Sequence, residues 1–298
     1  MAAFNPNRQV FDAHLHLGTW GTRELDGAPV TPLAAAAGDG YAVGTEHDTW
    51  RDCLAYLDAY GIGRGIVMAN YLAMDPGYSL LELNRRALEA PRRSDRLHAA
   101  LFVSPIAVEW VYTREALGWA GEAGVKAIKF TSTHWAPFTV NPATWDRVVY
   151  RNMEEILAVA RERGVPLQFH TGHLNSMPEE FDGFLAAFGS ELAVHLVHSG
   201  ETVYPGIQFV SRFPRWLEAG YDVYCDTSMC PGFVLPWLLR ELAATPQALE
   251  RILFATDAPW GSFPSEYWKV EALDVSEAVK DGIFWDNAHR LYEPGSAG

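Results

Sequence analysis

Short apolar segments alternate with segments of helical periodicity along the whole chain, and no other feature of the sequence limits the fold as much. Eight apolar strands are expected, and a helical segment follows each one. This is the pattern of a (β/α)8 TIM barrel, which fits as a single domain over residues 1–298. The expected strands are 10–18, 64–70, 97–105, 125–132, 166–172, 192–200, 222–228 and 251–260.

Glycine residues mark the ends of several expected helices, as at Gly61, Gly124 and Gly164. Two stretches without clear periodicity, 19–47 and 133–142, are expected to be loops that act as lids. The expected helices are 48–60, 79–90, 113–123, 143–163, 179–188, 207–219, 233–243, 267–279 and 285–292.

A doubly wound open sheet is the rival arrangement of alternating strands and helices. It normally has a glycine-rich phosphate-binding turn after its first strand. Here the first strand ends in His14-Leu15-His16 instead. The sequence therefore favours the barrel, in which the strand ends and the loops that follow them form the active face.

The first strand carries Asp12, His14 and His16 at alternate positions. Because side chains of a strand alternate between its two faces, these three are expected on one face. Two imidazoles at the end of a strand lie close enough to bind one metal ion, and a pair of hydrogen-bonded core histidines is the alternative. The apolar residues between them are expected to pack together on the other face: Phe11, Ala13, Leu15 and Leu17.

Three later strands also end in side chains that can bind a metal ion: His170, His198 and Asp257. Burying an isolated carboxylate is costly unless a partner neutralises it, and a metal ion is the best partner for Asp257. These three side chains and the two histidines of the first strand fall at the same end of the expected barrel, which indicates a metal site there. His195 lies nearer the middle of its strand and is expected to be a core or helix-facing histidine.

These motifs resemble those of the amidohydrolase superfamily over nearly the whole chain, from Val10 to Tyr292. The ending 287–291 is similar to the closing helix of the branch that holds aminocarboxymuconate semialdehyde decarboxylase and related hydrolases. A phosphoesterase family that also opens with His-x-His matches less well, because Pro259 stands where that family has a further histidine. The matching pieces are Asp12-Ala13-His14-Leu15-His16, His170, His198-Ser199-Gly200 and Phe254-Ala255-Thr256-Asp257-Ala258-Pro259.

The resemblance implies that His14, His16, His170 and Asp257 hold one divalent metal ion. Zinc is expected first, and manganese and iron are alternatives because imidazole and carboxylate accept each of them. The resemblance also implies that His198 stays off the metal and handles the metal-bound water. In relatives with two metal ions the matching histidine is itself a ligand, and the fourth strand supplies a carboxylated lysine or a glutamate.

Lys129 is expected on the inner face of the fourth strand, because its neighbours Ile128 and Phe130 are expected to face outward. It could be a carboxylated bridge between two metal ions, a cation that binds substrate, or a structural partner of Asp257. The branch named above commonly keeps a lysine here without a second metal ion.

Further side chains in the strand-end loops are candidates for substrate contact. Trp20 and Trp260 follow the first and eighth strands, where packing of a lid is the alternative role. His134 and His173 follow the fourth and fifth strands, where solvated loop histidines are the alternative. The seventh strand is expected to place three polar side chains on its inward face, namely Tyr224, Asp226 and Ser228.

Metal-activated water suits hydrolysis of an amide, a lactone or another ester. Asp257 is placed to ligate the metal and to take a proton from that water, and His198 can act as general acid or base. The alternative is non-oxidative decarboxylation of a small carboxylic acid, in which a protonated histidine supplies the incoming proton. No arginine stands at an inward strand end to hold a substrate carboxylate, so hydrolysis is expected. A non-catalytic ligand-binding barrel is a third hypothesis.

Composition limits the partners of the chain. A net charge of −14 opposes binding to nucleic acid and to anionic membranes, so a small-molecule substrate is expected. The three cysteines form no Cys-x-x-Cys pair, and no stretch is long enough to span a membrane, which together predict a cytoplasmic protein. The resemblance suggests a homodimer.

Overall fold

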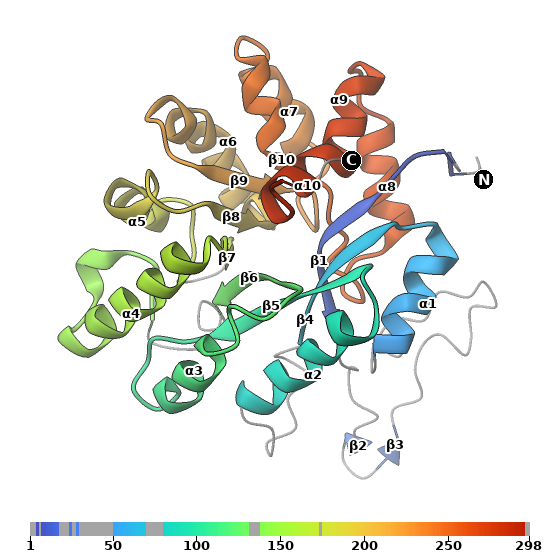
Figure 1. The fold of residues 1–298 in the computed structure, drawn as a ribbon. Coiled ribbons are helices and arrows are strands. Elements are labelled where there is room, and N and C mark those ends of the chain that lie inside the picture. The colour runs from blue at the N-terminus through green and yellow to red at the C-terminus, as the bar shows by residue number, and fades with distance from the viewer. Residues whose placement is uncertain are drawn as a thin grey trace.

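The chain folds into a barrel of parallel strands surrounded by helices, as Figure 1 shows. Eight strands follow one another around the sheet in sequence order. Backbone hydrogen bonds from Ala13 N to Phe254 O, at 3.0 Å, and from Asp257 N to His14 O, at 2.8 Å, join the first strand to the last. The expected TIM barrel is confirmed, and an open sheet is excluded because its two edge strands would not meet. This computed structural model describes residues 4–5, 7–17, 24–25, 28–29, 50–69, 80–130, 138–172 and 175–295.

The strands of the barrel are β1 (Phe11–Leu17), β4 (Arg64–Ala69), β5 (Leu97–Val103), β6 (Val125–Phe130), β7 (Leu167–His170), β8 (Val194–Val197), β9 (Val223–Asp226) and β10 (Ile252–Leu253). A short antiparallel pair, β2 (Glu24–Leu25) and β3 (Ala28–Pro29), lies within the stretch 19–47 that was expected to be a loop. The rest of that stretch up to residue 47, and residues 133–137 of the second expected lid, lie outside the described residues.

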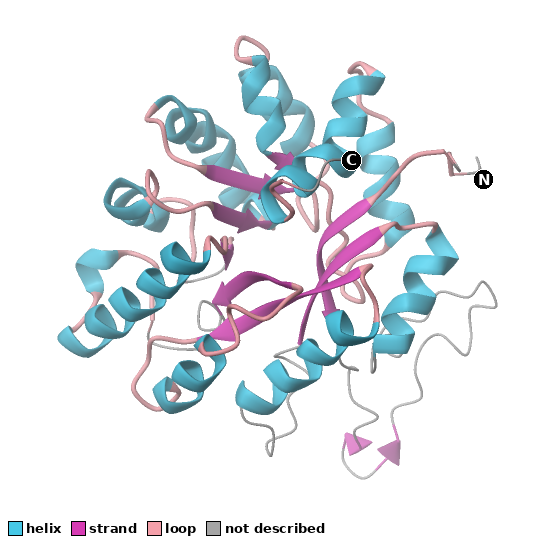
Figure 2. Cartoon of the chain, viewed as in Figure 1, coloured by secondary structure: helices cyan, strands magenta, loops and turns pink. Residues whose placement is uncertain are grey.

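Helices cover the outside of the barrel (Figure 2). They are α1 (Trp50–Tyr60), α2 (Leu80–Arg93), α3 (Trp110–Leu117), α4 (Arg147–Arg163), α5 (Glu180–Phe188), α6 (Val203–Glu218), α7 (Val234–Leu242), α8 (Phe263–Glu271), α9 (Glu277–Asp281) and α10 (Asn287–Tyr292). Shorter helical turns are η3 (Pro142–Thr144), η4 (His198–Gly200), η5 (Pro246–Arg251) and the π-helical η6 (Gly282–Asp286).

Capping side chains set several helix boundaries that differ from the expected ones. The helix expected at 143–163 begins only after Asp146, whose carboxylate accepts two backbone N–H groups of the first turn. The helix expected at 267–279 is divided into α8 and α9, and Ser276 caps the second of them. The helix expected at 113–123 is observed as α3, three residues earlier at its start, so Thr113 lies inside it, and the Thr113 hydroxyl donates to the backbone carbonyl of Ser104 after β5.

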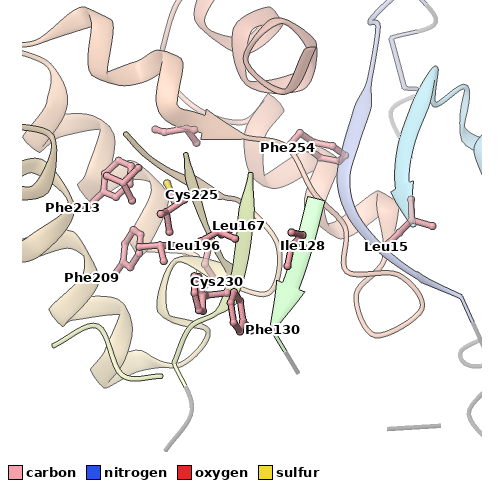
Figure 3. Close-up of a cluster of buried hydrophobic side chains, with 14 of the residues drawn as sticks. Leu15, Ile128, Phe130, Leu167, Leu196, Phe209, Phe213, Cys225, Cys230 and Phe254 are labelled. Atoms are coloured by element: carbon pink, nitrogen blue, oxygen red, sulfur yellow. The ribbon is translucent and has the colours of Figure 1, made fainter. Parts of the chain in front are cut away.

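A large apolar cluster fills the space between the barrel and its helices, and Figure 3 shows part of it. Ile128 and Phe130 of β6 belong to this cluster, as expected for outward-facing residues. The ring of Phe130 stacks on that of Phe169 with centroids 4.3 Å apart. Ala127 belongs instead to a second cluster, which lines the inside of the barrel.

The expectation that the apolar residues of β1 share one face is wrong. Phe11 and Ala13 pack in the inner cluster, whereas Leu15 and Leu17 pack with the outer one. The pairing of β1 with β4 shifts register between Asp12 and Leu15, and an extra residue at such a bulge reverses the alternation of side chains.

Helix α10 packs against the inner cluster at the end of the barrel where the strands begin (Figure 1). Ala288, Leu291 and Tyr292 belong to that cluster. This end is therefore filled by side chains, and polar groups gather at the opposite end, where the strands finish. No helix among the residues just delimited is both long and apolar enough to cross a membrane.

Candidate metal centre and active site

Three side chains at the strand ends bring their ligand atoms together. His14 Nε2 lies 3.1 Å from His16 Nε2 and 3.5 Å from Asp257 Oδ1. His16 Nε2 lies 3.1 Å from the same carboxylate oxygen. Ligands at about 2.1 Å from an ion are about 3.0–3.4 Å apart at ordinary coordination angles, so this triangle has the dimensions of a metal site.

The protonation states of these groups fit a cation. His16 donates its Nδ1 proton to the carbonyl of Ala69 at 3.1 Å, which leaves Nε2 with a lone pair toward the triangle. Burial lowers the pKa of His14 well below its usual value, and the ammonium of Lys129 acts in the same direction. Asp257 Oδ1 is buried and receives no hydrogen bond from the described residues. Two imidazole nitrogens and a carboxylate oxygen without a hydrogen bond from the described residues suit a divalent ion.

Asp12 fixes the two backbone segments that present this triangle. Its carboxylate accepts hydrogen bonds from the backbone N–H of His14 at 3.2 Å and of Thr256 at 3.0 Å, and from the Thr256 hydroxyl. Burial raises the pKa of Asp12 to about 7, against the effect of these hydrogen bonds. Asp12 therefore links β1 to the segment after β10, where Asp257 adopts a left-handed backbone conformation with φ 56°.

His170 and His198 lie beside the triangle. The ring centroid of His198 is 5.1 Å from that of His14 and 4.6 Å from that of His170. His170 does not join the group of ligand atoms above, because its Nε2 lies 3.1 Å from Glu201 Oε2. Burial raises the pKa of Glu201 to about 7, and the charge of Asp257 adds to this.

Glu201 is a site residue that sequence reasoning missed. It follows the turn η4 and has a φ of 52°, so the period of a strand could not place it. Its position three residues after His198 is the only signal in the sequence.

Lys129 faces the interior of the barrel, as expected, and is 4% exposed. Its Nζ has no hydrogen-bond partner among the described residues. Burial lowers the pKa of Lys129 to about 8, although the charges of Asp257 and Asp226 oppose that shift. A buried ammonium without a partner is costly, which indicates that an anion completes this site.

His195 also points into the barrel and is completely buried, so of the two alternatives the core histidine is confirmed and the helix-facing one is wrong. Its Nδ1 lies 2.6 Å from the hydroxyl of Tyr292 on α10, and its Nε2 lies 3.0 Å from Asp226 Oδ2. Both His195 and His198 face inward because the chain leaves the strand conformation in η4 immediately after Val197.

Of the remaining substrate candidates, the structure describes Trp260. Trp260 is half-buried, and its backbone N–H donates to the carbonyl of Asp257 at 2.8 Å, so it stands beside the triangle. Trp20, His134 and His173 lie outside the described residues.

Comparison with solved structures finds the same fold in several enzymes. A dihydroxybenzoic acid decarboxylase from Polaromonas sp. JS666, solved with manganese and the inhibitor 2-nitroresorcinol, is 18% identical, with a TM-score of 0.62 over 97% of this chain and 98% of that one. The 5-carboxyvanillate decarboxylase of Sphingomonas paucimobilis is 13% identical, with a TM-score of 0.63 over 96% and 99%. A probable 2-pyrone-4,6-dicarboxylic acid hydrolase from Acinetobacter baumannii is 12% identical, with a TM-score of 0.63 over 95% and 99%. No curated protein matches significantly.

The expectation of hydrolysis is wrong. Decarboxylases predominate among the similar solved structures, which favours the alternative named from the sequence. The argument for hydrolysis was the lack of an inward arginine, but Lys129, one of whose expected roles was to bind substrate, places a cation inside the barrel that has no hydrogen-bond partner among the described residues.

Sequence comparison gives the family directly. The model of the amidohydrolase family matches residues 11–293, which is nearly the whole chain. The matched range includes all three residues of the triangle, from the histidines of β1 to the aspartate that follows β10. The chain is a member of the amidohydrolase family.

Proposed function

We propose that the protein is a metal-dependent, non-oxidative decarboxylase of a small carboxylic acid. One observation carries the proposal: the triangle of His14, His16 and Asp257 lies in the same barrel mouth as the Lys129 ammonium, which has no hydrogen-bond partner among the described residues. A metal ion and a buried cation together favour an anionic substrate over a neutral amide or ester. The predominance of decarboxylases among proteins of this fold supports the same reaction.

His14, His16, His170 and Asp257 would hold the metal ion, and His170 would exchange its contact with Glu201 for the metal. Zinc and manganese both suit this set of nitrogen and oxygen donors, and the similar decarboxylase from Polaromonas binds manganese. When bound, the ion supplies a Lewis acid that polarises a substrate oxygen.

The residues of the chain would then position the acid and supply a proton. Lys129 binds an anionic oxygen of the substrate. The bond between the substrate and its carboxylate breaks, carbon dioxide leaves, and His198 donates the proton that takes its place. Burial lowers the pKa of His198, and the negative charge of a bound substrate acts in the opposite direction by favouring the protonated imidazole.

The decisive experiment measures carbon dioxide release together with proton transfer to the product. Metal-loaded protein is incubated in D2O with a panel of hydroxybenzoic acids and their decarboxylated products, and both carbon dioxide release and exchange of ring hydrogen for deuterium are measured. Decarboxylation predicts both signals with a matching acid and phenol. Both should disappear in His198→Asn while the metal content stays the same, and His14→Ala should lose the metal itself. His289→Asn, which changes a histidine at the other end of the barrel, is the control.

Two results would contradict the proposal. One is a protein that takes up no metal on reconstitution. The other is a metal-loaded protein that hydrolyses an ester or a lactone and neither releases carbon dioxide nor exchanges hydrogen.

A further inference from the structure

Asp226, at the end of β9, collects hydrogen bonds beneath the candidate proton donor. Its Oδ1 accepts from the backbone N–H of His198 at 3.0 Å, from the backbone N–H of Ser228 at 3.0 Å and from the Ser228 hydroxyl at 2.6 Å. Because two backbone N–H groups donate to it, Asp226 Oδ1 acts as a hydrogen-bond acceptor.

The proton positions between Asp226 and His198 follow from this. The Ser228 hydroxyl has one proton, and the short contact to a charged carboxylate fixes that proton on the Asp226 side. The Ser228 oxygen, 2.9 Å from His198 Nδ1, must then accept. His198 consequently carries a proton on Nδ1, and its Nε2 is the nitrogen left for the reacting atoms.

The other oxygen of Asp226, Oδ2, connects this series of contacts to the end of the barrel that α10 closes. Gln168 Nε2 donates to the Tyr292 hydroxyl oxygen at 2.8 Å, so the Tyr292 proton points to His195 Nδ1, 2.6 Å away. His195 then carries its own proton on Nε2, which lies 3.0 Å from Asp226 Oδ2. These contacts connect α10 to Asp226 through His195.

The loop that carries Ser228 is fixed independently of this series. The Lys269 ammonium on α8 donates to the carbonyls of Thr227 at 3.0 Å and of Cys230 at 3.1 Å. It also donates to the carboxylate of Glu266 at 2.7 Å. The Ser228 hydroxyl is completely buried and is therefore held in place by its neighbours on both sides.

We propose that Ser228 and Asp226 are positioning residues that hold His198 in the tautomer with its proton on Nδ1 and direct Nε2 to the substrate. The part played by His198 in this inference rests on the proposed function, whereas the tautomer itself does not.

The test reads the tautomer directly. Long-range proton–nitrogen correlation spectra of zinc-loaded protein labelled in histidine distinguish protonated from unprotonated ring nitrogens, and His198→Asn assigns the signals. We expect the wild type to show a protonated Nδ1 at His198 and the Ser228→Ala variant to lose this preference. Ser199→Ala is the matched control, because the Ser199 hydroxyl donates to the backbone carbonyl of Asp226 rather than to its carboxylate.

A kinetic measurement separates positioning from a merely structural role. Ser228→Ala should lower kcat about 10- to 100-fold, with little change in KM and with unchanged metal content. Asp226→Asn should act in the same direction, and Ser228→Ala decides alone where that variant folds poorly. A wild-type spectrum with the proton on Nε2, or an unchanged tautomer in Ser228→Ala, would overturn the inference. The spectra need no substrate, so a chain with the expected tautomer and no carbon dioxide release would refute only the proposed function.

Discussion

Lys129 is a buried cation at the candidate site, and its Nζ has no hydrogen-bond partner among the described residues, which is energetically costly. Lys129 is surrounded by His14, Asp226 and Asp257, none of which reaches its Nζ with a hydrogen bond. A fold tolerates such a group where a bound ligand supplies its hydrogen-bond partner. The free-energy cost of removing the ammonium from water is then met during folding, before the substrate binds. Lys129 is for this reason the residue that best separates the roles considered for the site.

Replacing Lys129 by methionine should weaken substrate binding and leave the metal in place. A hydrogen bond to a charged group contributes about 1.5–3 kcal/mol, so KM should rise about tenfold or more. Metal content by elemental analysis should stay at about one ion per chain. Lys126→Met, on the same strand but outside the inner cluster, is the control. Loss of metal from the Lys129 variant would indicate instead a carboxylated lysine between two ions.

The sequence located the residues of the triangle because each stands at or just after a strand end, where the topology of the barrel brings distant residues together. It could not locate Glu201 or orient His195, because the turn after β8 has left-handed residues that interrupt the period of two. The roles of His170 and His198 remain predictions, since His170 contacts Glu201 rather than the triangle.

At the scale of elements, buried side chains complete the hydrogen bonding of strands that end near the site. Asn84 on α2 donates to the carbonyl of Phe102 at 2.8 Å and accepts from the N–H of the same residue at 2.7 Å. Asn84 is completely buried, so water cannot replace it. The Asn84 side chain on α2 thereby makes, with the Phe102 backbone near the end of β5, the kind of paired hydrogen bonds that a neighbouring strand makes.

Asn84→Ala should therefore destabilise the fold strongly. It removes both buried hydrogen bonds between Asn84 and the Phe102 backbone, and we expect the free energy of unfolding to fall by about 2–4 kcal/mol, measured by urea denaturation. Asn152→Ala is a matched control, because the side chain of Asn152 donates one such bond, to the carbonyl of Pro105 at 2.7 Å. Equal losses in the two variants would show that the paired bonds to Phe102 are not the cause.

The order of the elements was predictable from the sequence, since eight apolar segments with helical segments between them allow few other folds. Boundaries were less predictable, because they depend on tertiary contacts. The bulge in β1 is an example: it allows Asp12 to reach Thr256 across the closed barrel, a contact that exists only once the last strand is in place.

At the scale of the whole molecule, the C-terminal segment holds the floor of the barrel together. Glu293, just after α10, pairs with Arg64 of β4, and its Oε1 lies 2.9 Å from His98 Nε2 on β5. His289 contacts the other carboxylate oxygen of Glu293 at 3.3 Å. One carboxylate thus joins the end of the chain to two strands of its first half.

Burial of His98 predicts a loss of stability in acid. It lowers the pKa of His98 from 6.5 to about 4, against the opposing charge of Glu293. Between these values the unfolded chain binds a proton that the folded protein does not, so the free energy of unfolding should fall as the pH falls from 6.5 to 4. At about 1.4 kcal/mol per pKa unit, the full contribution of His98 is about 3.5 kcal/mol, of which about 2 kcal/mol or more falls within this range.

Urea denaturation of wild type, His98→Gln and His289→Gln across this pH range isolates that contribution. Carboxylates elsewhere also titrate there, so the informative quantity is the difference in slope between each variant and the wild type. His98→Gln should flatten the decline by about 2 kcal/mol over the range, because glutamine takes up no proton in either state. His289→Gln is the matched control, because it changes the more exposed histidine at the same carboxylate. If the slope of His98→Gln matched that of the wild type, the acid sensitivity would have to arise elsewhere, and the carboxylate of Glu293 would hold the floor of the barrel whatever the charge on His98.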